Sequence, residues 1–259
     1  MPLIRYDDTD ARAFAATRHL DSGALDGWRA AIERHARPQR LLDLGAGTGS
    51  WTRAFRTWWP DAEITAVEPS PAMRAEAGQP MLAGHAADIP LPDAGVDTVW
   101  ISTVIHHIPD LPAAAGEIHR ILRPGGRVLI RSVFRGRHHG VTLFRYFPQA
   151  VAALERYPRV TDVQDAFNSF TTTALDTVPQ QTATSLTEVA DTLRREAHTP
   201  LQLITDQAYA EGAARLRQAA RDAQGPVIDH LDLLVLSSAA ADQPDPEHRE
   251  RAAPRPARP

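Results

Sequence analysis

The sequence predicts an α/β fold, with a doubly wound and mostly parallel sheet of seven strands and helical cap elements. Two observations carry this prediction. Between residues 40 and 133, short apolar runs alternate with longer amphipathic segments, the pattern of parallel strands joined by crossover helices. A glycine-rich stretch, "GAGTG", directly follows the first apolar run, where open α/β sheets bind their ligands.

Seven apolar runs are predicted to be strands. Five of them, one weak, belong to the alternating part of the chain, and a long helical insertion separates the last two. In chain order the predicted strands are RLLDL, AEITAVE, MLAGH (the weak one), VDTVWIS, GRVLIRSV, TTTALDTVPQ and VIDHLDLLVLS.

Prolines, glycines and serines mark the ends of the predicted helices. The helix SWTRAFRTWW ends before Pro60, and Ser70 with Pro71 opens the next one, because serine caps a helix and proline is tolerated in its first turn. The helix LPAAAGEIHRIL ends before the turn RPGG. The segments TLFRYFPQAVAALERYP and TDVQDAFNSF are predicted to be helical, as is most of 185–223.

Three parts of the chain follow from this pattern. Residues 1–36 are expected to form an N-terminal helical cap, and residues 37–240 a single sheet domain with helical insertions at 138–170 and 185–224. The tail 241–259 is rich in proline and charge, which predicts disorder or, as the alternative, a short extended segment docked on a partner.

Composition narrows the chemistry. The formal net charge of -4 argues against a nucleic-acid partner and favours a small molecule. Cysteine is absent and all 28 basic residues are arginine, which excludes thiolate chemistry and a lysine Schiff base. The chain also lacks a signal-peptide pattern and an apolar run of about 18 residues, so we expect a cytoplasmic protein without a membrane segment.

The glycine spacing selects among nucleotide-type ligands. Gly45, Gly47 and Gly49 allow a sharp turn and a close approach of a ligand to the backbone. Position 50 is serine, so neither the dinucleotide pattern G-x-G-x-x-G nor a phosphate loop is present. Glu68, at the end of the second predicted strand, is placed to accept hydrogen bonds from a ribose diol. This combination remains compatible with an adenosyl ligand that lacks phosphates.

Four motifs occur together in one order: LLDLGAGTGSWT, VEPSPAM, HAADIPLPDAGVDTVWIS and EIHRILRPGGRVLI. Each alone also has an ordinary structural explanation, such as a turn or a strand end. As an ordered set they resemble the class I S-adenosylmethionine-dependent methyltransferases of the small-molecule type (methyltransferase type 11-like). The resemblance implies a Rossmann-like fold, S-adenosylmethionine as cofactor and S-adenosylhomocysteine as product.

The resemblance also implies a cofactor site, whose first part is the glycine loop. Gly45, Ala46 and Gly47 would present backbone to the methionine and ribose parts of the cofactor, and Gly49 would complete the turn. Asp43 would lie near the ammonium group of the cofactor.

The second part of the implied cofactor site follows the later strands. Glu68 would bind the ribose hydroxyls and Met73 would pack on the adenine ring. Asp88 would accept from the adenine amino group, with the Ile89 amide beside it, and Ser102 would line the pocket.

Two histidines follow the fourth motif's strand. His106 and His107 lie where the acceptor is expected, and imidazole titrates near neutral pH, so either is a candidate general base, with His107 favoured. A structural or cofactor-side role is the alternative. Adjacent histidines point apart, here and at residues 138 and 139, so no metal site is expected.

The region after the fifth predicted strand is expected to cover the acceptor. Arg135 and Arg137 face solvent or pair with an anionic acceptor, while Phe144, Tyr146 and Phe147 line an apolar pocket or close the core. The resemblance thus implies methyl transfer to a small molecule, with O-methylation in specialised metabolism favoured. The alternatives are C- or N-methylation, or a protein that binds the cofactor without transferring methyl, such as a cofactor-braced cyclase or a ligand-gated binding module.

Overall fold

The structure is a computed structural model that describes residues 22–240. Its centre is a six-stranded sheet in the order β2-β1-β3-β4-β6-β5. The pairs β2-β1, β1-β3 and β3-β4 are parallel, whereas β6 runs antiparallel to both of its neighbours. The strands are β1 (Arg40–Leu44), β2 (Glu63–Val67), β3 (Val96–Ser102), β4 (Leu122–Ser132), β5 (Phe170–Ala183) and β6 (Val227–Ser238).

The doubly wound α/β fold is confirmed, but the predicted count of seven strands is wrong. The weak strand MLAGH forms only two isolated bridges, Val67 with Leu82 and His85 with Asp88. Leu82 donates to Ala66 O and accepts from Glu68 N, after which the chain turns back at residues 85–88. Pro80, just before it, cannot donate to a ladder, and this edge does not extend into a fourth parallel pair.

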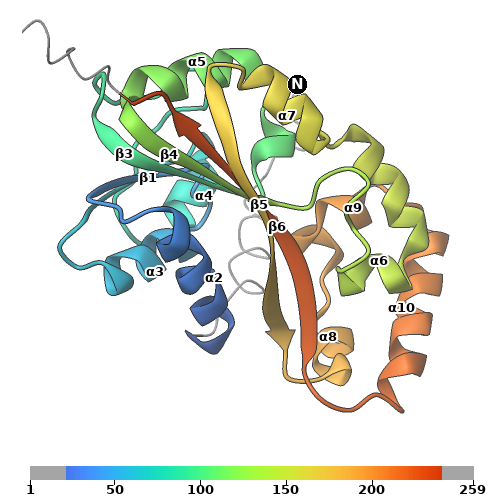
Figure 1. The fold of residues 1–259 in the computed structure, drawn as a ribbon. Coiled ribbons are helices and arrows are strands. Elements are labelled where there is room, and N and C mark those ends of the chain that lie inside the picture. Colours follow the sequence, from blue (N-terminus) through green and yellow to red (C-terminus); the bar gives the residue numbers. More distant parts are fainter. Residues whose placement is uncertain (1–21, 241–259) are drawn as a thin grey trace, which may run out of the picture.

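Helices cover both faces of the sheet (Figure 1). Strand side chains alternate, so Leu41 packs with α2 (Ser22–His35) and α3 (Ser50–Trp58), while Leu42 points to the other face. That other face packs against α5 (Leu111–Ile121) and α7 (Val160–Ala166). Both faces are therefore buried, which explains the near-continuous apolar runs of the central strands.

The helix ends agree with the sequence signals. The α4 helix (Pro71–Glu76) has proline in its first turn, and Ser70 Oγ accepts from Met73 N at 3.3 Å. Asp110 caps α5 by accepting from Ala113 N at 2.9 Å. Between β3 and α5 lies a 3-10 turn, η1 (Ile105–His107).

A third apolar core lies outside the sheet. It packs Phe147, Leu201 and Leu216 together, and β5 and β6 extend to it beyond the rest of the sheet (Figure 1). We call this region the cap. Its elements are α6 (Thr142–Tyr146), η2 (Pro148–Arg156), α8 (Leu186–Thr192), η3 (Arg195–Ala197), α9 (Thr199–Gln202) and α10 (Asp206–Ala220).

Two predicted helices have different bounds. The segment 142–158 is not one helix: α6 ends at Tyr146 and a 3-10 helix begins at Pro148, which cannot continue the α-helical hydrogen bonding. The predicted helix at 161–170 ends at Ala166, because Phe170 already pairs with β6 as the first residue of β5.

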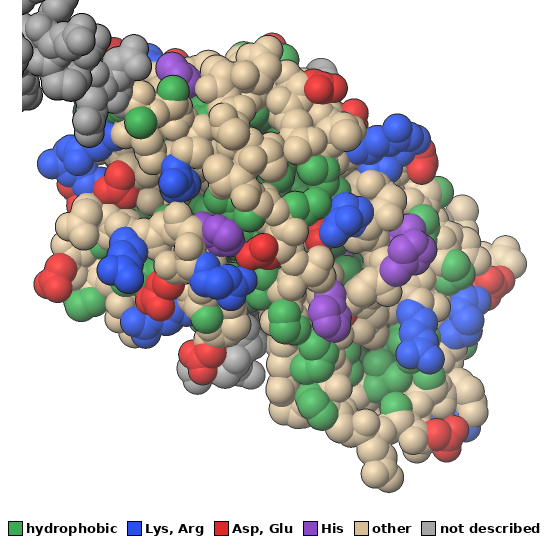
Figure 2. Space-filling view, in the orientation of Figure 1, with side chains coloured by type: hydrophobic (Ala, Val, Ile, Leu, Met, Phe, Trp, Pro, Cys, Tyr) green, Lys and Arg blue, Asp and Glu red, His purple; other side chains and the backbone are tan. Residues whose placement is uncertain are grey.

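Basic and acidic side chains are interspersed over the face shown in Figure 2. Among the described residues, no helix combines the length and the apolar character needed to cross a bilayer. The tail 241–259 and the first 21 residues of the expected N-terminal cap lie outside the described residues.

Candidate functional site

A cavity of about 460 Å³ lies between the glycine loop and the cap, beyond the carboxyl ends of β1, β3 and β4. Parallel α/β sheets bind ligands at this edge. The half nearer the loop and the half nearer the cap are called the cofactor half and the acceptor half below. Of the predicted site residues, those that line the cavity are Asp43, Gly45, Ala46, Gly47, Glu68, Met73, Ser102, His106 and His107.

The glycine loop is fixed to β2 by its backbone. Gly45 N and Ala46 N both donate to Val67 O, at 2.8 and 3.1 Å. Gly45 has a φ of +73°, and a Cβ there would lie 2.7 Å from both methyl groups of Val104. Glycine is therefore needed at position 45 for the packing of the loop itself, in addition to any ligand it admits.

Gly49 has a different surrounding. It precedes α3 with a φ of +78°, and Gln79 Nε2 donates to its carbonyl oxygen at 3.0 Å. A Cβ at this position would lie 2.0 Å from that same nitrogen. Gly49 does not line the cavity, so its contact in the structure is with Gln79.

Glu68 is fixed by two backbone amides. Its carboxylate accepts from Gly47 N at 2.9 Å and from Ser70 N at 2.8 Å, and the residue is 7% exposed. Burial raises the pKa of Glu68, while the two amide donors oppose this shift. A carboxylate has about four acceptor positions, so the geometry leaves capacity for two ribose hydroxyls.

Asp43 is the most deeply buried carboxyl group of the cavity. It is 1% exposed and accepts a 2.6 Å hydrogen bond from Thr52 Oγ1. Burial, together with the charge of Glu68, raises the pKa of Asp43 to about 7, against the opposing hydrogen bonds from Thr52. A cationic ligand beside this group would favour its ionised form, so the carboxyl suits an ammonium or a sulfonium.

The other residues predicted for the cofactor site fall into two groups, those that line the cavity and those that do not. Met73 and Ser102 line the cavity, as expected for an adenine contact and a pocket wall. Asp88 is exposed and Ile89 is buried, and neither lines the cavity. The Ile89 amide instead donates to Glu117 Oε2 at 3.1 Å. The adenine-binding roles of residues 88 and 89 stay predictions.

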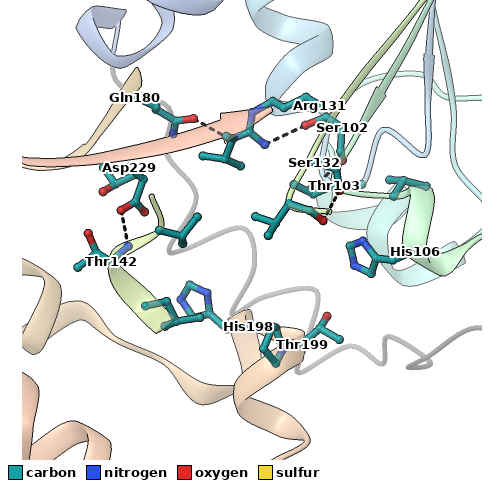
Figure 3. Close-up of a pocket in the computed structure, with 18 of the residues that line it drawn as sticks. Ser102, Thr103, His106, Arg131, Ser132, Thr142, Gln180, His198, Thr199 and Asp229 are labelled. Atoms are coloured by element: carbon teal, nitrogen blue, oxygen red, sulfur yellow. Dashed lines mark hydrogen bonds between the residues drawn. The ribbon is translucent and has the colours of Figure 1, made fainter. Parts of the chain in front are cut away.

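The two histidines of η1 face the acceptor half. The ring centroids of His106 and His107 are 4.2 Å apart, and His106 stacks on Tyr157 at 3.9 Å with an interplanar angle of 9°. The His107 amide donates to Val104 O, which joins the turn to the residue that packs on Gly45. Figure 3 shows His106 at the cavity wall.

The acceptor half is mainly apolar. Phe144, Tyr146 and Phe147 line it, and Phe144 and Phe147 also belong to the core of the cap, so these rings serve both as lining and as core. Asp229 of β6 brings a carboxyl group, which accepts from Thr142 N at 2.8 Å. Burial raises the pKa of Asp229.

The loop arginines are engaged within the protein. Arg135 forms an ion pair with Glu155, and Arg137 binds both oxygens of the buried Asp232, at 2.6 and 2.9 Å. Neither lines the cavity. Within residues 22–240, no group of three or more potential ligand side chains is arranged to hold a metal ion.

Arg131 is one of the cavity residues that the sequence analysis missed. Arg131 of β4 is 6% exposed; it donates to Ser102 Oγ at 3.2 Å and to Gln180 Oε1 at 2.6 Å (Figure 3). Its guanidinium lies 4.8 Å from the ring centroid of Trp28 and 5.4 Å from that of Trp51. The sequence does contain one sign of this role. Arg131 ends the run VLIR, at a strand position where an apolar side chain is expected.

The fold and this site define an α/β domain with a cavity at the carboxyl edge of its sheet, lined by the glycine loop and Glu68. Residues 42–130 match the family described as a methyltransferase domain. This segment is similar to the class I S-adenosylmethionine-dependent methyltransferases, and S-adenosylmethionine is the cofactor of that family.

Curated relatives match part of the chain. A malonyl-[acyl-carrier protein] O-methyltransferase of Serratia marcescens is 36% identical over 103 residues, which are 38% of this chain and 40% of that protein. A ubiquinone/menaquinone biosynthesis C-methyltransferase of Methylobacterium nodulans is 34% identical over 136 residues, 46% of this chain and 54% of that one. The chain thus spans about half the length of these relatives, or less.

Solved structures share the architecture. A protein of Anabaena variabilis, provisionally named a methyltransferase of an antibiotic biosynthesis pathway, aligns with a TM-score of 0.62 at 19% identity. The alignment covers 81% of this chain and 95% of that one. At this identity the likeness shows the fold, including the part of the chain beyond the family match.

Proposed function

We propose that this chain transfers a methyl group from S-adenosylmethionine to a small-molecule acceptor, with oxygen as the favoured methylated atom. The observation that carries the proposal is the single cavity, which joins the glycine loop and Glu68 to the apolar interior of the cap. A cofactor and an acceptor bound in its two halves would meet beside Ser102 and the η1 histidines. Such an arrangement supplies the proximity that a displacement reaction requires.

The residues of the cofactor half would hold the cofactor. Glu68 would accept from the ribose hydroxyls, and Gly45, Ala46 and Gly47 would present backbone to the methionine part. Asp43 would face the positive charge of the cofactor, since its pKa of about 7 lets a nearby cation favour ionisation. Met73 would pack on the adenine ring.

S-adenosylmethionine, when bound, supplies a methyl group on a sulfonium, which needs no metal for activation. His107 would accept the acceptor proton at Nε2, because its Nδ1 atom is buried in the protein. His106, stacked on Tyr157, would form part of the acceptor wall. The cap side chains would exclude water from the reacting groups.

The relatives support two versions of the reaction. One relative is named an O-methyltransferase and another a C-methyltransferase, and both are more than 30% identical to this chain over the aligned residues. We favour oxygen because a neutral histidine suits removal of a hydroxyl proton. A carbon acceptor with an acidic proton would use the same base and is the second candidate.

The test combines identification and turnover. Native mass spectrometry of the purified protein, followed by heat extraction, should release S-adenosylmethionine or S-adenosylhomocysteine. Incubation with S-adenosylmethionine and a panel of phenols, carboxylic acids and acidic methylene compounds should then form S-adenosylhomocysteine. Binding of the cofactor without product for any acceptor would favour a protein that binds but does not transfer. Failure to bind added cofactor would overturn the proposal altogether.

A further inference from the structure

The wall between the two halves of the cavity contains a permanent positive charge. Arg131 is the one buried basic side chain among residues 22–240, apart from those whose burial is not described. Arginine stays protonated at all relevant pH values, so its charge cannot be relieved by loss of a proton. Burying such a charge costs free energy unless opposite charge or strong hydrogen bonds compensate it.

The protein holds this guanidinium in one orientation. Ser102 and Gln180 accept from its two terminal nitrogens, and the rings of Trp28 and Trp51 lie within cation-π distance. Gln180 is itself 7% exposed and also accepts from Trp28 Nε1 at 2.9 Å. Ser102, Gln180 and the two rings come from separate elements and hold the cation in place, which preorganises it for an anion.

The surroundings of Arg131 indicate what kind of ligand the cation suits. The cofactor half already contains two carboxyl groups, Asp43 and Glu68, which suit donors and cations. The acceptor half is mostly apolar, and its carboxyl group, Asp229, interacts electrostatically with Arg131. A ligand with an apolar body and one anionic end would match both the cap interior and the guanidinium.

We propose that Arg131 binds a carboxylate of the acceptor, so that the acceptor is a small organic acid with an apolar body. This proposal rests on the function proposed above and specifies the substrate class of that same cavity. Arginine forms two parallel hydrogen bonds to a carboxylate, which an uncharged amide cannot match. The cofactor also carries a carboxylate, and the experiment separates the two sources.

The first test compares charged and neutral ligands of equal shape. Calorimetry on the protein saturated with S-adenosylhomocysteine compares the binding affinity of hexanoate with that of hexanamide, and the affinity of phenylacetate with that of phenylacetamide. We expect each carboxylate to bind about 10-fold or more tightly than its amide. Equal binding within both pairs would overturn the proposal. This comparison uses the unmodified protein, so it does not depend on the folding of a variant.

The second test uses variants. Arg131→Gln should abolish the preference for the carboxylate, Arg131→Lys should keep part of it, and Arg145→Gln, on an exposed side chain outside the cavity, should keep all of it. A preference that persists in Arg131→Gln contradicts the proposal. Thermal unfolding confirms that each variant is folded.

The third test identifies the source of the carboxylate. One outcome is that Arg131→Gln weakens the binding of S-adenosylhomocysteine about 10-fold and leaves the affinity for 5′-methylthioadenosine unchanged. In that case Arg131 binds the cofactor carboxylate and the proposal is overturned. Unchanged affinity for both ligands supports the proposal that Arg131 binds a carboxylate of the acceptor. Failure of the unmodified protein to bind S-adenosylhomocysteine would instead refute the proposed function, and the carboxylate pairs are then compared on the cofactor-free protein.

Discussion

The cofactor half of the cavity presents backbone amides and two buried carboxyl groups, whereas the acceptor half presents rings and aliphatic side chains from several short helices. The first is built by consecutive segments: β1, the glycine loop and the end of β2. The second gathers side chains from α6, η2, α8 and β6, which are far apart in the sequence. Binding of a constant cofactor needs only the local segment, while acceptor choice depends on the assembled cap.

The largest expected effect tests the acceptor half. His107→Gln should lower kcat by about 100-fold or more if His107 is the general base, while cofactor affinity stays nearly unchanged. His85→Gln, on an exposed residue away from the cavity, is the matched control. Stopped-flow or steady-state rates and calorimetry check both quantities. Weaker cofactor binding with unchanged kcat would assign His107 to the cofactor half instead.

Gly45→Ala tests the local construction of the cofactor half. It should lower the free energy of unfolding by about 2 to 3 kcal/mol, because a side chain is strained at positive φ and its Cβ would meet Val104 at 2.7 Å. Gly78→Ala has a similar φ of +63° and open space around it, so it should show the strain alone. The double variant Gly45→Ala/Val104→Ala should recover part of the loss in denaturant titrations. No recovery would exclude the Val104 contact as the cause.

Glu68→Ala should weaken cofactor binding by about 1 to 3 kcal/mol, since the ribose hydroxyls lose a charged acceptor. Glu63→Ala, at the exposed start of β2, should leave the affinity unchanged. Calorimetric titration with S-adenosylhomocysteine distinguishes the two. Equal affinities for both variants would remove Glu68 from the cofactor site.

Taken per pH unit, the smallest expected effect comes from the ionisation of Asp43. Because burial raises the pKa of Asp43 from 3.8 to about 7, a cationic cofactor should bind more tightly as pH rises toward 7, by up to about 10-fold per unit, and level off above. The free energy of unfolding of the cofactor-free protein should fall over the range from about 4 to 7, since the folded state holds the proton more tightly there. Asp43→Asn should flatten both profiles. A profile unchanged in that variant would point to another titrating group.

Most residues predicted for the cofactor half line the cavity, because the determinants of their positions are local. Strand periodicity, glycine at positive φ and a carboxylate after β2 each follow from residues close in the chain. Local reasoning was wrong at MLAGH, where the chain forms only isolated bridges and turns back at residues 85–88. The Ile89 amide donates to Glu117, which lies on a helix 28 positions further on, and sequence reasoning did not foresee this contact.

The acceptor half could be predicted only as helical and aromatic. Arg131 acquires its role from Ser102, Gln180 and two tryptophans, which the fold assembles from separate elements. The alternation of β4 marks Arg131 as unusual, but nothing in the sequence gives its partners. Pro148 similarly divides the cap helix, and the resulting 3-10 segment positions Tyr157 for its stack on His106.

All five tryptophans of the chain lie in one connected group of rings, at positions 28, 51, 58, 59 and 100. The group touches the cavity at Trp51 and surrounds Arg131 from one side, while the cap contains no indole. Intrinsic fluorescence of this protein is therefore a local optical signal. Changes in tryptophan emission will report ligands at the junction of the two halves. Unfolding of the cap alone will change the emission spectrum very little.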